Sequence, residues 1–123
     1  MSDFTIRGLD HVTITAPEEL EKEVLEFYGN LMGLERLEQP EGTGSPDAWF
    51  ALGDVQLHVS RDSHNPPPTA HFAVTVVDFD AAVARLRDSG YHIEQAYPVP
   101  GTRRLYTRDP AGNQVEIVGY DKP

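Results

Sequence analysis

The sequence carries one internal repeat, and this repeat constrains the fold more than any other feature. Two segments of the first half return in the second half: LDHVTIT (9–15) returns as TAHFAVT (69–75), and DVQLHVS (54–60) returns as NQVEIVG (113–119). Polar and apolar residues alternate along these segments, which is typical of half-buried strands. The chain is therefore predicted to contain two equivalent modules related by a pseudo-twofold axis.

The repeat places metal-binding side chains at equivalent positions. His11 aligns with His71, and His58 aligns with Glu116. Folding about the pseudo-twofold axis could bring all four to one point, where three imidazole nitrogens and a carboxylate oxygen suit a divalent metal. Each of the four lies on the polar face of its predicted strand, opposite the side chains expected to pack on a helix.

Composition limits the classes of function. The hydrophobic content of 39% is enough for the core of one compact domain, and no apolar run is long enough to span a membrane. A net charge of -10 argues against nucleic acid or an anionic membrane as partner, and the absence of cysteine excludes disulfides and thiolate ligands. The N-terminal residues lack the pattern of a signal peptide, so we expect a cytoplasmic protein.

Apolar spacing and turn formers predict the elements of the first half. The strand at 9–15 precedes a helix whose apolar stripe ends at Gly33, then a short strand at 34–38 and a hairpin at 48–60. The stripe consists of Leu20, Val24, Phe27, Tyr28 and Leu31.

The second half repeats this order. A strand at 70–76 precedes a helix that Asp78 caps and Gly90 ends, then a short strand at 92–95 and a hairpin at 103–118. Both halves are therefore predicted to have the order βαβββ.

These elements define the domain organisation. We predict a single α+β domain over 1–123, in which paired βαβββ modules form a cupped mixed β-sheet. Module one spans 5–60 and module two spans 70–120. The Pro-rich linker at 61–69 contains three consecutive prolines, which favour an extended connection.

The element order, the His early in each half and the segment DPAGNQVEIV at 109–118 resemble the vicinal oxygen chelate superfamily. This group shares the glyoxalase/bleomycin resistance/dioxygenase fold. The most specific motif, DPAGNQVE, is similar to the family pattern DPxGNxxE, in which the Glu is a metal ligand. The resemblance implies His11, His71 and Glu116 as metal ligands, with His58 at a fourth position that glyoxalases fill with Glu and epimerases with Gln.

The resemblance also implies a metal-dependent reaction on a small substrate that chelates the metal through vicinal oxygens. One divalent metal per site is expected, and Ni, Zn, Co, Fe or Mn suits these ligands. The first prediction is an isomerase or lyase of the glyoxalase I type, with Glu116 and then His58 as candidate general base. Two alternatives stay open: an Fe(II)-dependent extradiol-type dioxygenase, and a drug- or metabolite-binding resistance protein without turnover.

Neighbouring strands offer candidate substrate contacts. Arg104, or its neighbour Arg103, could grip an anionic group, and Tyr106 could donate a hydrogen bond. Trp49 and Phe50 lie on the corresponding strand of module one and could form an apolar wall, with the choice between them open.

The family resemblance also bears on assembly. Members of this size are commonly homodimers, either with the cup closed within one chain or with modules exchanged between chains. Both arrangements stay open from the sequence. Pairing of two chains would cover sheet edges that a short two-module sheet exposes.

Overall fold

The computed structural model describes residues 4–63 and 69–121. The centre of the predicted Pro-rich linker, 64–68, lies outside these residues. Module one contains these elements: β1 (His11–Ala16), a 3-10 turn (Glu18–Leu20), α1 (Glu21–Glu26), a π-helical turn (Phe27–Leu31), β2 (Arg36–Leu37), β3 (Ala48–Leu52) and β4 (Val55–Arg61).

Module two repeats this order: β5 (His71–Thr75), α2 (Phe79–Asp88), β6 (Glu94–Gln95), β7 (Thr102–Arg108) and β8 (Gln114–Tyr120). The predicted cap is confirmed, because the Asp78 carboxylate accepts a hydrogen bond from the Ala81 amide at 3.0 Å. Gly90 ends the helix with φ of 80°, a left-handed conformation that glycine adopts without steric cost. The order βαβββ is therefore found twice, as predicted.

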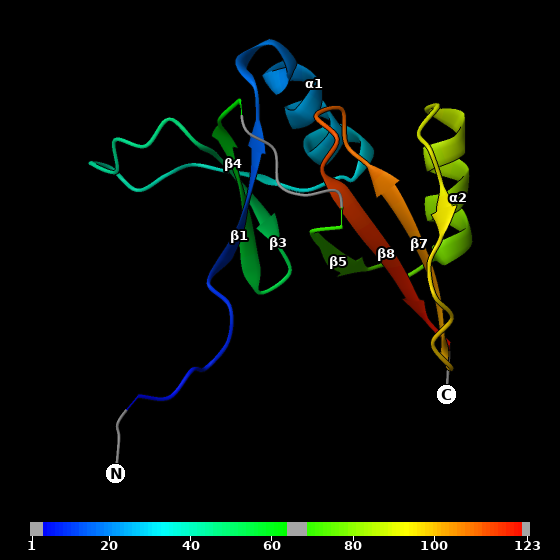
Figure 1. The fold of residues 1–123 in the computed structure, drawn as a ribbon. Helices are drawn as coiled ribbons and strands as arrows, with labels where there is room; N and C mark the ends of the chain where they lie inside the picture. The colour runs from blue at the N-terminus through cyan, green and yellow to red at the C-terminus, as the bar shows by residue number, and fades with distance from the viewer. Residues whose placement is uncertain (1–3, 64–68, 122–123) are drawn as a thin grey trace.

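Each module forms a mixed sheet of its own. The strand orders are β1-β4-β3-β2 and β5-β8-β7-β6, so β1 and β5 each lie at an edge. The first strand of each module pairs in parallel with the last, and the other neighbours are antiparallel. Figure 1 shows the two sheets side by side, with α2 on the outer flank of module two.

The two modules share one hydrophobic core. The predicted apolar stripe is confirmed, since Val24, Phe27 and Tyr28 are at most 1% exposed. The helix that carries the stripe is not uniform: it begins as a 3-10 turn and ends as a π-helical turn, where Met32 N–H bonds to the Phe27 carbonyl. Side chains from this helix and from the sheet of module one join side chains of module two in a single buried cluster.

A buried polar network ties the modules together at the turn that ends β7. Asp109 Oδ2 accepts hydrogen bonds from Tyr28 Oη at 2.8 Å and from Asn113 Nδ2 at 2.9 Å. Asn113 Nδ2 also donates to the Thr15 carbonyl of β1. Burial, and then the charge of Asp109, raise the pKa of Tyr28 far above its usual value, so the phenol stays protonated and donates. The DPAGN segment therefore joins module two to module one.

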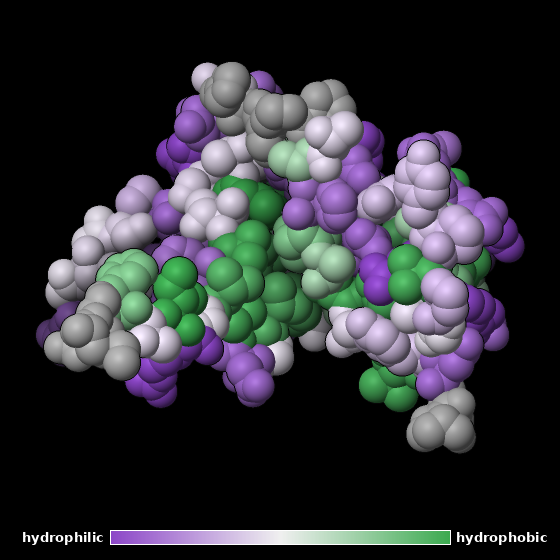
Figure 2. All heavy atoms as spheres, turned by 60° about the horizontal axis from the view of Figure 1, so that its bottom comes forward, coloured by the Kyte–Doolittle hydropathy of each residue, from purple (hydrophilic) through white to green (hydrophobic). Residues whose placement is uncertain are grey.

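The face seen in Figure 2 has hydrophobic side chains gathered between the two halves of the molecule. A cavity of about 280 Å³ lies between the end of the first helical segment, β5 and α2. Its apolar lining includes Leu31, Met32, Leu34, Val74, Ala82 and Leu86. Among the described residues, no helix has the length and hydropathy needed to cross a bilayer.

Candidate metal site

His11 and His58 form the first pair of the site. Their strands, β1 and β4, run parallel with Thr13 opposite His58, so both imidazoles project from one face of the sheet. The rings stack with centroids 4.1 Å apart and planes 14° apart. His58 is 7% exposed, and the His11 side chain is 40% exposed.

Trp49 extends this stack on the other side of His58. It lies opposite His58 across β3 and β4, and the two rings are 4.3 Å apart with planes 1° apart. Since β4 lies between β1 and β3, His58 is held between Trp49 and His11. Of the two aromatic residues predicted here, Trp49 therefore faces the site.

Phe50 does not belong to the site, which corrects the prediction for this residue. Alternation along β3 turns it to the helix-covered face, where it is 2% exposed and contacts Tyr28 with centroids 6.5 Å apart. It is a core residue.

His71 and Glu116 form the second pair. Glu116 lies opposite Ala73 on the parallel neighbours β5 and β8, and His71 Nε2 is 3.0 Å from Glu116 Oε1. The Glu116 side chain is 8% exposed. Tyr106 lies opposite Glu116 on β7 and contacts the edge of the His71 ring, with centroids 5.2 Å apart.

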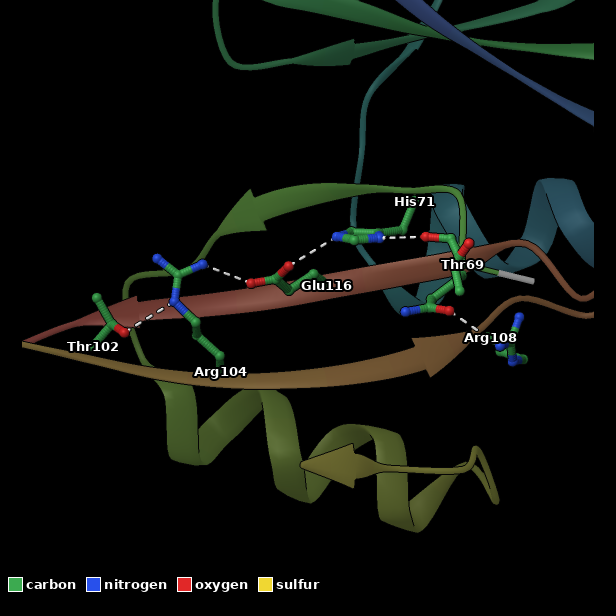
Figure 3. A network of polar contacts seen from close by, with 7 residues as sticks. Thr69, His71, Thr102, Arg104, Arg108 and Glu116 are labelled. Carbon is green, nitrogen blue, oxygen red and sulfur yellow. Dashed lines mark hydrogen bonds and ion pairs between the residues drawn. The ribbon is translucent and has the colours of Figure 1, made fainter. Parts of the chain in front are cut away.

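Arg104 completes a chain of polar contacts around Glu116. Its Nη1 donates to Glu116 Oε2 at 2.6 Å, and its Nε donates to Thr102 Oγ1 at 3.0 Å. Figure 3 shows Arg104 on one side of the Glu116 carboxylate and His71 on the other, with Thr69 beyond His71. The carboxylate is therefore held from two directions.

Arg103 lies on the opposite face of β7 and is outside the site, which corrects the prediction for it. Its Nη1 donates to Asp80 of α2 at 2.9 Å, and its guanidinium lies 4.7 Å from the centre of the Phe79 ring. The side chains of Arg103 and Arg104 thus lie on opposite faces of β7.

Hydrogen bonds to the imidazoles determine which ring nitrogens are free. His11 Nδ1 is 2.7 Å from Asp10 Oδ1, and His71 Nδ1 is 2.9 Å from the Thr69 carbonyl. A carboxylate and a carbonyl only accept, so both Nδ1 atoms donate and each neutral ring presents the Nε2 lone pair. Metal-binding histidines are oriented by partners of this kind.

The second pair, His71 and Glu116, also offers donor atoms that a metal ion can bind. His71 Nδ1 is bonded to the Thr69 carbonyl, and its Nε2 forms an ion pair with Glu116 Oε1 at 3.0 Å when the ring is protonated. With the ring neutral and Nδ1 as donor, the Nε2 lone pair and the carboxylate oxygen lie side by side, as two neighbouring metal ligands would. The donor set of nitrogen and carboxylate oxygen suits Zn, Ni, Co, Fe or Mn.

His58 has its own positioning contact. Its Nε2 lies 2.8 Å from Gln56 Oε1, so Nε2 donates and Nδ1 carries the lone pair. Burial, and then neighbouring His11, lower the pKa of His58, which favours the neutral ring that metal coordination requires.

The structure brings the four predicted ligands together as two pairs. Among residues 4–63 and 69–121, no group of three or more His, Cys, Asp or Glu side chains is close enough to hold one metal ion. Each module of one chain therefore presents half of the predicted ligand set.

Four residues around the site were not predicted from the sequence: Asp10, Gln56, Thr69 and Thr102. Asp10 and Gln56 could have been predicted as partners of a ligand, since each lies one or two residues from a candidate ligand. Thr69 acts through its backbone carbonyl, which no side-chain pattern reveals.

Comparisons with known proteins agree with this architecture. The model of the Glyoxalase/Bleomycin resistance protein/Dioxygenase superfamily matches residues 8–117. A glyoxalase family protein from Bacillus anthracis is 31% identical, with 98% of this chain and 100% of that chain covered and a TM-score of 0.85. No curated protein matches the chain.

Two further solved structures share the fold at lower identity. The antibiotic binding protein TnmS3 from Streptomyces sp. CB03234 is 20% identical, with 96% and 99% of the two chains covered and a TM-score of 0.76. Lactoylglutathione lyase from Agrobacterium tumefaciens is 22% identical, with 94% and 95% covered and a TM-score of 0.72. The match over residues 8–117 places this chain in the Glyoxalase/Bleomycin resistance protein/Dioxygenase superfamily.

Proposed function

We propose that the protein is a divalent-metal-dependent isomerase or lyase of the glyoxalase type, acting on a small substrate that chelates the metal through two vicinal oxygens. The observation that carries the proposal is the placement of His71 Nε2 and Glu116 Oε1 3.0 Å apart, a nitrogen and a carboxylate oxygen side by side as neighbouring metal ligands would lie. The ordered outer contacts of His11 and His71 support the same conclusion.

We further propose that two chains build each site. His11 and His58 of one chain would meet His71 and Glu116 of a second copy, because the two pairs form no single group among the described residues. Each sheet ends in edge strands, β1 and β2 in module one and β5 and β6 in module two, and sheet edges are surfaces that another chain can cover. A homodimer with exchanged modules would contain two equivalent sites. The cytoplasmic location of the protein stays a prediction.

The residues of the site would divide the chemistry among them. A bound metal supplies Lewis acidity that stabilises negative charge developing on substrate oxygens. Glu116 is the first candidate for moving a proton from the carbon next to a carbonyl, and it would have to leave Arg104 or His71 to do so. His58 is the second candidate, because it stands where glyoxalases carry a glutamate.

The substrate contacts come from both sheets. The indole of Trp49 offers an apolar surface stacked on His58, and Tyr106 can donate a hydrogen bond beside His71. Arg104 adds positive charge next to Glu116, in a chain whose net charge is -10. A small anionic or strongly polarised oxygen substrate fits this arrangement.

Metal analysis of the purified protein tests the proposal, alongside His11→Ala, His58→Ala, His71→Ala and Glu116→Ala. We expect one metal per chain in the wild type and loss of metal in the His11, His71 and Glu116 variants. Trp49 is the only tryptophan of the chain and stacks on His58, so its fluorescence reports binding directly. A wild type that stays metal-free with Ni, Zn, Co, Fe and Mn would refute the proposal.

Mixing two variants tests the shared site. His11→Ala and Glu116→Ala each lack metal, but a mixed dimer with exchanged modules contains one site with all four ligands. After random exchange of chains, about a quarter of the sites should bind metal again. No recovery in a mixture shown to contain mixed dimers would place all ligands of a site within one chain.

A second candidate function is binding without turnover. Glu116 already has a counter-charge in Arg104, so its carboxylate is electrostatically matched without a metal. The similar fold of an antibiotic binding protein is compatible with this role. Iron content with O₂ consumption would instead point to the dioxygenase alternative.

A further inference from the structure

The two oxygens of Glu116 have different partners. Oε1 faces His71 Nε2 at 3.0 Å, on the side of the candidate metal position, whereas Oε2 accepts from Arg104 Nη1 at 2.6 Å. A contact this short between a guanidinium and a carboxylate is a strong charge-assisted hydrogen bond. One oxygen is thus committed to a protein cation before any metal binds.

Arg104 is itself fixed in place. Its Nε donates to Thr102 Oγ1 at 3.0 Å, from two residues earlier on the same face of β7. The Arg104 side chain is 21% exposed and that of Glu116 is 8% exposed, so water screens the pair only weakly. Rotation of the carboxylate toward a second metal bond would break a partly buried ion pair.

We propose that Arg104 is a positioning residue that limits Glu116 to one metal-ligating oxygen and so keeps room on the metal for both oxygens of the substrate. The inference rests on the proposed metal site. It gives Arg104 a role in addition to any grip on an anionic substrate group.

Counting ligands shows why this restriction matters. Three imidazole nitrogens and one carboxylate oxygen would fill four positions of a six-coordinate ion, which would leave two for a chelating substrate. A carboxylate can also bind through both oxygens. In that case only one position would remain, and a substrate with vicinal oxygens would lose one of its two bonds.

The chain supplies a matched control in the neighbouring arginine. Arg103 makes an ion pair of the same kind, with Asp80 at 2.9 Å, but on the opposite face of β7. Arg103→Gln therefore removes the same charge and a comparable contact without touching Glu116.

The test uses Co²⁺-loaded protein and two oxygen- or nitrogen-donor probes. Acetohydroxamate binds a metal through two neighbouring oxygens, and azide binds through one nitrogen. Both are followed in the visible spectrum of the bound Co²⁺. We expect Arg104→Gln to weaken acetohydroxamate by at least about tenfold, because the probe would lose one of its two bonds to the metal. The affinity for azide should stay unchanged in Arg104→Gln. That result would exclude the loss of positive charge as the cause of weaker acetohydroxamate binding.

The Co²⁺ spectrum gives a readout that needs no probe. A second carboxylate oxygen in Arg104→Gln should raise the coordination number and lower the visible absorption of bound Co²⁺. Arg104→Lys keeps the charge without the planar fork and should restore the wild-type behaviour only in part. Arg104→Lys is also the variant to measure if Arg104→Gln does not fold. Arg103→Gln should match the wild type throughout.

Three results would overturn the proposal. Unchanged acetohydroxamate affinity and spectrum in Arg104→Gln would show that Glu116 needs no restriction. Loss of Co²⁺ itself in Arg104→Gln would show that Arg104 serves metal affinity instead. A wild type that binds no Co²⁺ or other tested metal would remove the metal site and this inference together, whereas the first two results leave the proposed function intact.

Discussion

At the scale of single residues, the rings of the candidate ligands are oriented by groups that are not themselves candidate ligands. Asp10 and Thr69 each accept a hydrogen bond from an imidazole Nδ1, and Gln56 accepts one from His58 Nε2. These contacts select one tautomer of each neutral ring and orient its free nitrogen. The candidate ligands could be named from the sequence, but the orientation of their rings comes from these partners.

Replacing Asp10 with Ala is expected to weaken metal binding without abolishing it. The His11 ring would lose the carboxylate that fixes its orientation and raises its basicity. Since Asp10 is 92% exposed, we expect about a tenfold loss, the low end of the range for such partners. Competition with a chromophoric chelator measures the affinity. Asp88→Ala, at the end of α2, is the control, and equal affinities for both variants would contradict the prediction.

At the scale of elements, strand alternation sorts neighbouring residues into site and core. Trp49 faces His58 while Phe50 faces the helices, and Arg104 faces Glu116 while Arg103 faces α2. Both pairs could be located on their strands from the sequence. The choice within each pair required the register, because a shift by one residue exchanges the two faces.

Gly119 marks the closest approach of α2 to β8. A Cβ at this position would lie 2.8 Å from Phe79 Cβ, which is rooted in the helix and cannot swing away. We expect Gly119→Ala to lower the free energy of unfolding by about 1–3 kcal/mol through overpacking. Urea denaturation measures the loss. Gly29→Ala, where the nearest atom is 3.4 Å away, should be tolerated, and a similar loss in both variants would contradict this account.

At the scale of the whole molecule, the DPAGN turn has two roles. It precedes Glu116 in the family motif, and its Asp109 and Asn113 side chains bond to Tyr28 and Thr15 of module one. The relative placement of the two modules, and with it of the two candidate ligand pairs of one chain, therefore depends on a buried hydrogen-bond network as well as on the shared core.

Tyr28→Phe is expected to destabilise this junction by about 1–3 kcal/mol, because Asp109 would keep a buried charge with one hydrogen bond fewer. Chemical denaturation compares the variant with Tyr120→Phe, which alters a phenol that is 65% exposed. Equal unfolding midpoints for the two variants would show that the Tyr28 bond contributes no net stability.

Metal should stabilise the dimer if two chains share each site. At a free metal concentration 100 times the dissociation constant, binding adds about 2.7 kcal/mol per site to the folded state. Sedimentation equilibrium with and without Zn²⁺ should then show tighter association, and calorimetry should show a higher unfolding temperature. His58→Ala should reduce both effects. Metal stabilisation with no change in association would contradict the shared site.

The repeat, the strand alternation and the DPAGNQVE motif by themselves determined the βαβββ order and the family, and they named the four candidate ligands. These are local signals that a period of two or a turn residue encodes directly. Only the tertiary structure decided that the ligands lie in two pairs, that Trp49 and Arg104 face them, and that Arg104 holds one oxygen of Glu116. Those features depend on register and on contacts between strands distant in sequence, which no local pattern specifies.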